Sequence, residues 1–366
     1  MALNLPNKYR PRTLKEIIGQ YLNVSSLVYA ADNNQVPFCT MLRGPKGTGK
    51  TSSARIIAKC LNCETVKTST SSPCLQCNAC ISIERGTCDG VIEIDAASNR
   101  GIDDIKKLKQ SANYASFSVR NRVLIIDEFQ NLSNDAFGAL LKFLEEPPPH
   151  TYIVLCTTGS DRIPETILSR CISFEFSKFT SEQILDRLKS VCKTEGIEYE
   201  EVALRLISKN AKGGMRDALS LLEKAILAGS GRIVKEVASS ITNSFDYRFI
   251  IHILYALLER DMGKVLKITN GLEKASINAA NILDEVIENL YGIYAYKVTG
   301  DVNVLPNYQS EEQANELMTL SQCFDSQRLA GTIYTLSSST KDLVYNQNPR
   351  IFVDVALQKA MTMYHT

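Results

Sequence analysis

The stretch GPKGTGKT, residues 44–51, decides the fold class. It fits the pattern G-x-x-x-x-G-K-[ST], in which glycines let the backbone wrap so that its N–H groups face the phosphates of a nucleotide. The run FCTML before it is typical of a strand, and the run TSSARIIAKCL after it is typical of a helix. A glycine-rich turn of purely structural use is the alternative, and both flanks argue against it. The stretch therefore predicts a phosphate site at a helix N-terminus.

The residues expected to contact the nucleotide follow from this loop. Lys50 is expected to reach the β- and γ-phosphates, and the Thr51 hydroxyl to bind Mg²⁺. At the end of the apolar run RVLIID (122–127), Asp127 is expected to hold the Mg²⁺ shell and Glu128 to polarise the attacking water. An acidic pair is common at ordinary strand ends, so the prediction of a nucleotide hydrolase depends on its coupling to the phosphate loop. The expected phosphate-binding set is Gly44, Pro45, Lys46, Gly47, Thr48, Gly49, Lys50, Thr51 and Ser52.

The pattern of apolar runs predicts an α/β fold followed by helical segments. Short apolar runs at 37–42, 91–94, 122–127, 151–158 and 171–176 alternate with helical patterns. Continuous apolar strands separated by helices indicate a parallel sheet covered on both faces. In the helical part that follows, Thr180 and Gln183 form a candidate capping box, and Gly196 is a candidate helix stop. For a chain of 366 residues we expect three domains, at 1–178, 179–242 and 243–366.

Composition and charge limit the class of protein. Hydrophobic content is 44% and charged content 22%, which is ordinary for a soluble globular chain. No apolar run approaches the roughly 18 residues of a membrane span, and the N-terminus has no hydrophobic signal core. We therefore expect a cytoplasmic protein without a membrane partner, whose thiols stay reduced and form no disulfide framework. Residues 1–60 hold nine Lys or Arg and two acids, which favours a polyanion, although a solvated surface is the alternative.

Four cysteines interrupt the predicted nucleotide-binding sheet in the pattern C-x10-C-x2-C-x2-C; they are Cys63, Cys74, Cys77 and Cys80. Four thiolates suit structural zinc, which folds a short insertion without a core of its own. An iron–sulfur cluster is the alternative, but its usual further cysteine followed by proline is absent from residues 82–86. Unliganded thiols are the third reading. Cys60 and Cys88 are more typical of small core residues. We expect a zinc module at about residues 60–88.

The order of the motifs is similar to that of a known family. The motifs occur in this order along the chain: KYRPRTLKEIIGQ (8–20), the phosphate loop, the cysteine insertion, EIDAASNRGIDDI (93–105), LIIDE (124–128), TTGSDRIPETILSRC (157–171) and GGMRDALSLLE (213–223). With these motifs the chain resembles the gamma/tau subunits of the bacterial DNA polymerase III clamp loader, which are AAA+ ATPases. The resemblance covers essentially all 366 residues and is most specific before residue 243.

The resemblance implies further site residues. Thr158 would be the first sensor near the γ-phosphate, with a strand-end cap as its alternative. Arg216 would be the second sensor, reporting to a helical lid, and Arg170 the arginine finger that a neighbouring subunit can supply. The alternatives are an exposed helix arginine and a local salt bridge, respectively. Near the base and ribose the resemblance implies Tyr9, Arg10 and Arg12.

One departure from the family pattern follows the acidic pair. Members of the family often have a small residue and then His at this point, whereas this chain has Phe129 and Gln130. Asp127 and Glu128 are unaltered, so we expect hydrolysis. The change bears on how Glu128 is held before DNA arrives.

The implied activity is that of an ATP-driven switch. The resemblance implies an AAA+ P-loop sheet, a helical lid and a helical collar for oligomerisation; a generic helical bundle is the alternative to the collar. ATP, Mg²⁺ and Zn²⁺ are the implied cofactors. Implied partners are other copies of the chain, delta and delta-prime in a pentameric loader, the beta sliding clamp, and primed DNA that triggers hydrolysis. The resemblance also implies a place in a holoenzyme of the class DNA-directed DNA polymerase, a nucleotidyltransferase.

Two other functions and one set of DNA contacts remain open. An AAA+ DNA-remodelling motor, such as a branch-migration helicase, should lack the cysteine insertion. A non-hydrolysing clamp-loader scaffold should lack the intact run Gly49-Lys50-Thr51. DNA contacts would be mostly to phosphates, and their candidates could equally form an ordinary solvated helix face. These candidates are Arg100, Lys106, Lys107 and Lys109.

Overall fold

The computed structural model describes residues 4–66, 69–112, 119–159, 161–242, 247–274, 279–305, 311–343 and 348–362. The chain divides into two compact units, Met1–Val234 and Lys235–Thr366. The first unit holds both the expected nucleotide-binding segment and most of the expected lid segment. Ser160 of the 157–171 motif, and residue 243, where the third domain is expected to begin, lie outside the described residues.

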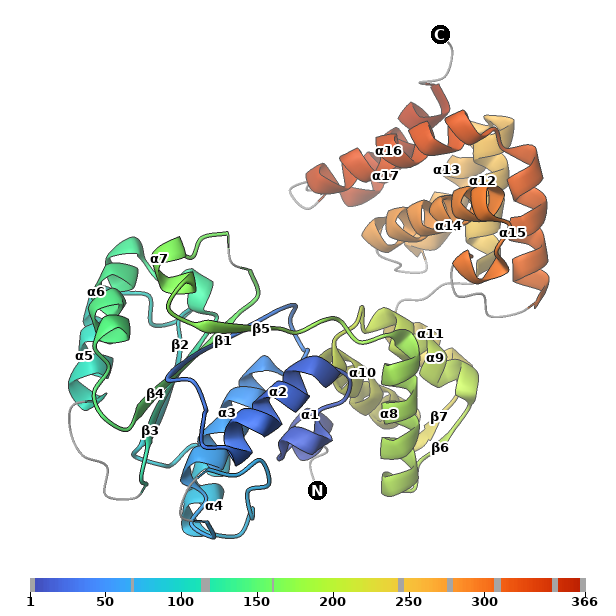
Figure 1. The fold of residues 1–366 in the computed structure, drawn as a ribbon. Helices are drawn as coiled ribbons and strands as arrows, with labels where there is room; N and C mark the ends of the chain where they lie inside the picture. The colour runs from blue at the N-terminus through green and yellow to red at the C-terminus, as the bar shows by residue number, and fades with distance from the viewer. Residues whose placement is uncertain are drawn as a thin grey trace. The chain divides into compact units, whose positions relative to one another are not determined.

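A five-stranded parallel sheet forms the centre of the first unit, with the strand order β2-β3-β4-β1-β5 (Figure 1). Its strands are β1 Cys39–Arg43, β2 Val91–Asp95, β3 Arg122–Asp127, β4 Thr151–Thr157 and β5 Ile172–Glu175. Each strand lies within or close to one of the apolar runs, so the predicted parallel sheet is confirmed. The order places the phosphate-loop strand β1 between β4 and β5, which come much later in the chain.

Helices cover both faces of this sheet, as the continuous apolar strands predict. Successive residues of a strand point to opposite faces. Leu42 and Ile125 therefore pack with helix α3, while Met41 and Leu124 pack with α5 and α6 (Figure 1). The helices and 3₁₀ turns of this part are α1 Leu5–Lys8, η1 Leu14–Glu16, α2 Tyr21–Asp32, α3 Lys50–Asn62, α4 Asn78–Arg85, α5 Ile102–Ala112, η2 Phe129–Asn131, α6 Asn134–Glu145 and α7 Glu165–Leu168.

Three helices complete the first unit after the sheet: α8 Ser181–Glu195, α9 Glu201–Asn210 and α10 Met215–Ala228. The predicted capping box is confirmed, because the Thr180 side chain accepts from the backbone of Gln183 and the Gln183 side chain accepts from the backbone of Thr180. The helix ends at Gly196, whose φ of 68° is a left-handed conformation that favours glycine. Two short strands, β6 Glu198–Tyr199 and β7 Arg232–Ile233, pair in parallel beside these helices.

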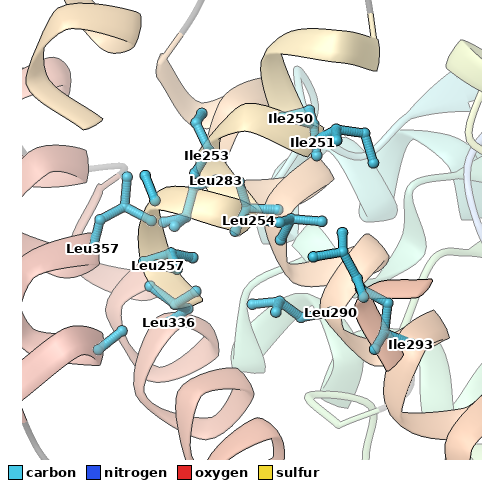
Figure 2. Packing of buried hydrophobic residues seen from close by; sticks show 14 of the residues in the cluster. Ile250, Ile251, Ile253, Leu254, Leu257, Leu283, Leu290, Ile293, Leu336 and Leu357 are labelled. Atoms are coloured by element: carbon cyan, nitrogen blue, oxygen red, sulfur yellow. The ribbon is translucent and has the colours of Figure 1, made fainter. Parts of the chain in front are cut away.

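The second unit is helical, with its own apolar core. Leu254, Leu283, Leu290, Leu336 and Leu357 are buried at its centre (Figure 2). Its elements are α11 Lys235–Thr242, α12 Tyr247–Glu259, α13 Met262–Lys274, α14 Ala279–Thr299, η3 Val302–Val304, α15 Glu311–Cys323, α16 Ser326–Leu343 and α17 Pro349–Thr362. Across the described residues of both units, none of the helices combines the length and apolar character needed to cross a bilayer.

One pair of cysteines departs from the expectation of reduced thiols. Cys39 and Cys171 form a disulfide between the first residue of β1 and the residue before β5. In the parallel register Thr40 lies opposite Ile172, so the two cysteines are also neighbours, with Cα atoms 4.8 Å apart. This pair is an exception to the expected reduced thiols, while the other nine cysteines are free and form no framework. The sequence did not indicate the pair, because 132 residues separate it and only the strand order brings it together.

Candidate nucleotide site and cysteine cluster

A pocket in the first unit collects most of the residues expected to bind the nucleotide. It is lined by Lys46–Ser52 of the phosphate loop, by Asp127 and Glu128, by the N-terminal segment and by side chains of α8 and α10. Gly44 and Pro45 lie behind this lining, and they contribute backbone carbonyls that contact Lys50. The parallel sheet explains the gathering, because the loops after β1 and β3 leave the sheet at the same edge.

The phosphate loop has a backbone that only glycine fits without strain at Gly44, Gly47 and Gly49. Gly44 has a φ of 141°, and a Cβ there would lie 2.1 Å from the carbonyl oxygen of Phe176. Gly47 has a φ of 77°. Lys50 is 7% exposed, and its Nζ donates to the carbonyl oxygens of Gly44 and Pro45 at 2.8 Å each. Burial lowers the pKa of Lys50. A cation held at the centre of the loop matches the predicted phosphate-binding role.

The predicted magnesium ligands meet at the mouth of the loop. The Thr51 hydroxyl donates to Asp127 Oδ2 at 2.6 Å, and the backbone N–H of Glu128 donates to Asp127 Oδ1 at 2.8 Å. Hydroxyl and carboxylate oxygens are the hard ligands that Mg²⁺ prefers. The donor set therefore fits a magnesium ion carried in with nucleotide phosphates.

Glu128 and Thr158 are joined by a residue whose role the sequence did not identify. Gln130 Nε2 donates to Glu128 Oε2 at 2.6 Å and to Thr158 Oγ1 at 2.8 Å. Its Oε1 accepts from Thr157 Oγ1 at 2.7 Å and from the Thr158 backbone N–H at 3.3 Å. Glu128 lines the pocket, whereas Thr158 is exposed and is outside the lining. The departure from the family pattern at Gln130 was the only signal in the sequence.

The N-terminal segment packs against the lid helix α8. Tyr9 donates its hydroxyl to Glu195, and this short hydrogen bond together with burial, which contributes most, raises the pKa of Tyr9 to about 12. The Arg187 guanidinium lies 5.5 Å from the centre of the Tyr9 ring and donates to the Tyr9 carbonyl at 3.2 Å. Tyr9 and Arg187 both line the pocket. Arg187 was missed, because a single arginine in an amphipathic helix has no distinguishing pattern.

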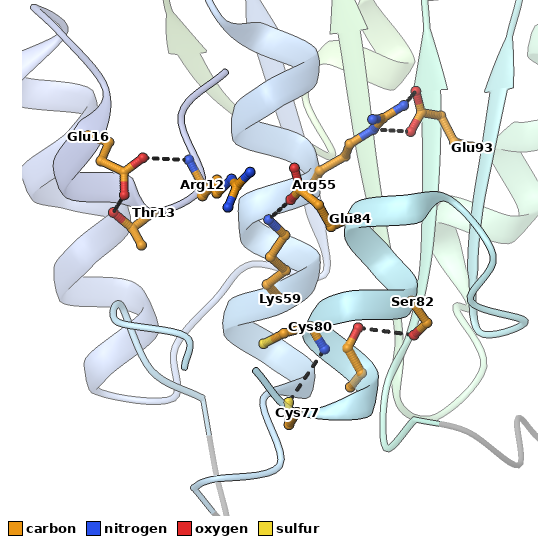
Figure 3. A network of polar contacts seen from close by, with 11 residues as sticks. Arg12, Thr13, Glu16, Arg55, Lys59, Cys77, Cys80, Ser82, Glu84 and Glu93 are labelled. Carbon is orange, nitrogen blue, oxygen red and sulfur yellow. Dashed lines mark hydrogen bonds and ion pairs between the residues drawn. The ribbon is translucent and has the colours of Figure 1, made fainter. Parts of the chain in front are cut away.

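The two arginines predicted beside Tyr9 differ in their position relative to the pocket. Arg10 lines the pocket, and its pKa is lowered by burial and by the nearby guanidinium of Arg55. Arg12 is exposed and is not part of the lining; its backbone N–H donates to Glu16 (Figure 3). Nothing in the geometry of the described residues supports a nucleotide contact by Arg12.

The lid helix α10 touches the phosphate loop directly. The backbone N–H of Met215 donates to the Gly47 carbonyl at 3.1 Å, and a Cβ on Gly47 would lie 3.1 Å from the Cα of Gly214. Arg216, the predicted second sensor, follows at once and lines the pocket. The phosphate loop therefore positions the start of the helix that carries Arg216.

Arg170, the predicted arginine finger, is not part of the pocket lining. Its guanidinium pairs with Glu145 at 2.8 Å and donates to the Thr166 carbonyl at 2.6 Å. About a third of the Arg170 side chain is exposed. The residue is thus held near the surface of its own chain, a placement that suits either a local salt bridge or a group presented to another subunit.

The four cysteines predicted to bind zinc lie together. The Sγ atoms of Cys63, Cys74, Cys77 and Cys80 are all within 4.8 Å of one another. A tetrahedral zinc with Zn–S distances of about 2.3 Å needs sulfur atoms roughly 3.8 Å apart, so a small contraction would complete the site. Backbone N–H groups point at three of the sulfur atoms, as in Cys80 N to Cys77 Sγ at 3.4 Å. The donor set and spacing fit a structural metal.

The cysteine module is attached to the phosphate-loop helix α3 by a buried charge pair. Lys59 is 1% exposed and its ammonium group contacts the Glu84 carboxylate of α4 (Figure 3). One turn earlier, Arg55 makes a bidentate contact with Glu93 of β2, at 2.6 and 2.9 Å. A buried charge is retained only when it is paired, so the Lys59–Glu84 contact fixes the module against the nucleotide-binding helix. The Arg55–Glu93 contact instead joins this helix to the sheet.

The basic residues predicted to contact DNA have mixed surroundings. Lys109 donates to the carbonyl of Ala139, and exposed Lys106 pairs with Asp103 at 3.3 Å. Lys107 is exposed on α5. Arg100 lines a polar hollow together with Arg162, Gln130 and the first residues of α6. Of the four candidates, Arg100 is the best placed to meet an anion.

Comparison with known proteins gives a consistent picture. The profile of the family described as "DNA polymerase III, delta subunit" matches residues 19–180, and that of "DNA polymerase III clamp loader subunit, ATPase lid domain" matches residues 183–231. The chain is 33% identical over 358 residues to DNA polymerase III subunit gamma of Buchnera aphidicola from Acyrthosiphon pisum, covering 98% of each protein.

Two longer relatives match over the same range. The chain is 37% identical to DNA polymerase III subunit tau of Bacillus subtilis and 33% identical to that of Escherichia coli. It covers 63% and 55% of these proteins, respectively, and each match includes 98% of this chain. The chain therefore spans little more than half the length of the tau subunits that it matches.

Solved structures are less similar. The RuvB Holliday junction branch migration motor of Thermotoga maritima has 21% identity and a TM-score of 0.48, over 69% of this chain and 80% of that one. The DNA clamp loader delta protein of Bacillus subtilis has 12% identity and a TM-score of 0.38, over 92% of this chain and 99% of that one.

Proposed function

Because the chain belongs to the family of DNA polymerase III gamma/tau subunits, we propose that it is the ATP-hydrolysing motor subunit of a bacterial clamp loader. The observation that carries the proposal is the single pocket that joins Lys50 of the phosphate loop, the Thr51–Asp127 pair, Glu128 and the lid residue Arg216. A binding scaffold has no need of a metal ligand and a water-polarising carboxylate at the same phosphate site.

The residues divide the work of hydrolysis among them. Lys50 exchanges its contacts with the loop carbonyls for contacts with the β- and γ-phosphates. Thr51 and Asp127 would hold Mg²⁺, which would supply positive charge beside the phosphate oxygens, and Glu128 would orient the attacking water. Arg216 contacts the nucleotide from α10, so that binding is transmitted to the lid. The Tyr9–Arg187 pair lines the same pocket and is proposed to contact the base and ribose.

We assign Arg170 to the neighbouring subunit's nucleotide. Its position outside the pocket of its own chain supports this assignment. An arginine supplied across an interface stabilises the charge that spreads over the transferred phosphoryl group. ATP would then order the ring of subunits, and hydrolysis would release it.

DNA is proposed to bind at the hollow lined by Arg100 and Arg162. Two guanidinium groups beside the N-terminus of α6 form a local positive field on a chain whose net charge is only +1. Such a field suits the phosphate backbone of primed DNA and requires no base reading. Contacts of this kind would make loading independent of sequence and dependent on salt.

The remaining parts serve assembly. The four-cysteine cluster is proposed to bind one structural zinc. The helical second unit is proposed as the collar through which copies of the chain assemble with delta and delta-prime around the beta clamp, in the bacterial cytoplasm. Its exposed apolar side chains, which would be available for contacts between subunits, include Tyr291, Val298, Tyr334 and Ile351.

Reconstitution tests the proposal. The chain is mixed with delta, delta-prime and the clamp, and ATPase activity is measured with and without primed DNA. We expect DNA to stimulate hydrolysis and the clamp to be loaded on primed circles. ATPase without clamp loading would favour a DNA-remodelling motor, and clamp loading without any hydrolysis by this chain would favour a scaffold.

A further inference from the structure

The disulfide between Cys39 and Cys171 joins two segments that bear on the nucleotide site. Cys39 is the first residue of β1, the strand that leads into the phosphate loop, and Cys171 directly follows Arg170. The bond links residues that are 132 positions apart and holds their Cα atoms 4.8 Å from each other. It therefore ties the segment that carries Arg170 to the strand that carries the phosphate loop.

The bonded segment has few other attachments. Among the described strands of the sheet, the four-residue β5 pairs with β1 alone, and its first residue, Ile172, is 56% exposed. Before β5, Ile167 of α7 is fully buried. Arg170 thus lies between one packed residue and one bonded residue, and its backbone can move only as far as Cys171 allows.

The two sulfur atoms differ in their access to solvent. Cys39 is 1% exposed, whereas Cys171 is only partly buried. Both pack in the apolar cluster between the sheet and helices α5 and α6, and among the described residues no third cysteine belongs to that cluster. Cys156 of β4 packs on the opposite face of the sheet, and burial raises the pKa of its thiol, which leaves little of the attacking thiolate. Exchange of this disulfide therefore needs a thiol from solvent, and the accessible atom is Cys171 Sγ.

We propose that Cys39 and Cys171 form a reversible redox site that controls whether Arg170 can leave the contacts of its own chain. In the oxidised state the segment is held where Arg170 meets Glu145 and the Thr166 carbonyl. In the reduced state the segment is free to carry Arg170 towards the nucleotide of a neighbouring subunit. The effect on hydrolysis rests on the proposed function, whereas the redox chemistry of the pair does not. Disulfides of proteins in a reducing compartment are usually transient and redox-sensing, and a cytoplasmic location is proposed for this chain.

The reaction is an exchange with a low-molecular-weight thiol, RSH. Its thiolate attacks Cys171 Sγ, the bond to Cys39 breaks, and Cys39 leaves as a thiolate that takes up a proton. A second RSH attacks the sulfur of the R group in the mixed disulfide, which forms RSSR and releases Cys171 as a thiol. Two electrons have then passed from two RSH molecules to the pair, and RSSR oxidises the pair by the reverse steps.

The first test measures the redox state of the pair in the full chain. The folded protein is equilibrated with mixtures of reduced and oxidised glutathione, quenched with acid, alkylated and digested. We expect mass spectrometry to find the linked Cys39–Cys171 peptide in oxidising mixtures, and to find both thiols alkylated in reducing ones, in either direction of titration. A linked peptide that never forms would overturn the inference, and so would one that persists in the folded chain in excess reduced glutathione.

The second test measures what the bond does to the segment and to the rate. Amide hydrogen exchange in residues 165–175 should be about tenfold or more faster in the reduced chain than in the oxidised one, because the covalent restraint beside Arg170 is gone. In the reconstituted complex with primed DNA, the oxidised chain should hydrolyse ATP about tenfold or more slowly than the reduced chain. A displacement of about 1 Å at a group that acts on the transition state can cost on the order of 10²-fold.

Three variants separate the pair from the other thiols. Cys39→Ala and Cys171→Ala cannot form the bond, so both should match the reduced parent in oxidising and reducing mixtures alike. Both keep the four clustered cysteines, so a loss of activity through oxidation of that cluster would persist in them. Cys323→Ala removes an exposed thiol of the second unit and should respond to oxidation as the parent does.

The outcomes distinguish the inference from the function on which part of it rests. Equal hydrogen exchange and equal ATPase rates in the two states, with the linkage verified in one of them, would overturn the inference. An oxidative loss of activity that is the same in Cys39→Ala and Cys171→Ala would also overturn it. If neither state hydrolyses ATP with DNA, the proposed function and the step at Arg170 fail, whereas reversible linkage with redox-dependent exchange at 165–175 would still establish the redox site.

Discussion

Replacing Arg170 by alanine separates a local salt bridge from a group that acts on the neighbouring subunit. In its own chain, Arg170 pairs with Glu145 at 2.8 Å, with side chains that are 35% and 48% exposed. A pair so open to solvent contributes about 0–1 kcal/mol to stability. If the local pair were its whole purpose, Arg170→Ala would lower the free energy of unfolding by no more than this and leave the rate of hydrolysis almost unchanged.

If Arg170 is an arginine finger, Arg170→Ala should have a much larger effect on the rate of ATP hydrolysis. Loss of an arginine finger costs on the order of 10³-fold in kcat, which corresponds to about 4 kcal/mol of transition-state free energy. The matched control is Glu145→Gln, which removes the partner's charge and keeps Arg170. We expect Glu145→Gln to hydrolyse ATP within about twofold of the parent, since only a solvent-exposed pair is lost.

The assay mixes two inactive chains. Arg170→Ala keeps Lys50, and Lys50→Ala keeps Arg170, so each should be nearly inactive in the reconstituted complex when used alone. Mixed complexes should recover part of the DNA-dependent ATPase activity, because an intact phosphate loop can then face an intact arginine. If co-assembly is verified and mixing restores nothing, Arg170 acts only within its own chain and the assignment is refuted.

The remaining predictions concern the phosphate site and the cysteine module. Lys50→Ala should abolish ATP binding, whereas Glu128→Gln should bind ATP in titrations and fail to turn it over in a single-turnover assay. Normal turnover by Glu128→Gln would show that the Glu128 carboxylate does not orient the attacking water. The purified chain should carry about one zinc by elemental analysis, and Cys77→Ser should lose it while still binding nucleotide; iron, or no metal in reduced protein, would contradict this. Glu84→Ala should lower stability by roughly 2–3 kcal/mol in denaturation, because it leaves the Lys59 charge buried without that carboxylate. Glu84→Gln, which keeps an acceptor, should cost less, and equal losses would argue against a charge effect.

Much of this fold could be predicted because its signals are local. The strands appear as continuous apolar runs, and the capping box at Thr180 and the stop at Gly196 depend on side chains within a few residues of the helix ends. The cysteine cluster is also local, apart from Cys63, and its spacing was enough to predict that the four Sγ atoms meet. Thr51 and Asp127 could be paired in advance because both follow strands of one parallel sheet.

The contacts that were missed arise from the order of the strands. Gln130 meets Thr158 because both follow adjacent strands, β3 and β4, at the same edge of the sheet. Cys39 meets Cys171 because β1 inserts between β4 and β5. In neither pair does one residue indicate the other in the sequence, since the contact depends on which strands become neighbours. Arg187 was missed for a similar reason, as its partner Tyr9 comes from the other end of the unit.

The contacts of Gln130 and Arg170 bear on why such a pocket would be inactive in an isolated chain. The phosphate loop and the metal ligands are already in place before any partner binds, with Lys50 and Thr51 held by hydrogen bonds of 2.6–2.8 Å. The groups that would act on the γ-phosphate are instead engaged elsewhere, Glu128 by Gln130 and Arg170 by Glu145. Each group has two contacts with the protein. Glu128 Oε2 also accepts from the Thr158 hydroxyl, and the Arg170 guanidinium also donates to the Thr166 carbonyl. We therefore expect nucleotide binding to precede hydrolysis, because Arg170 must leave Glu145 before it can act on the nucleotide of a neighbouring subunit.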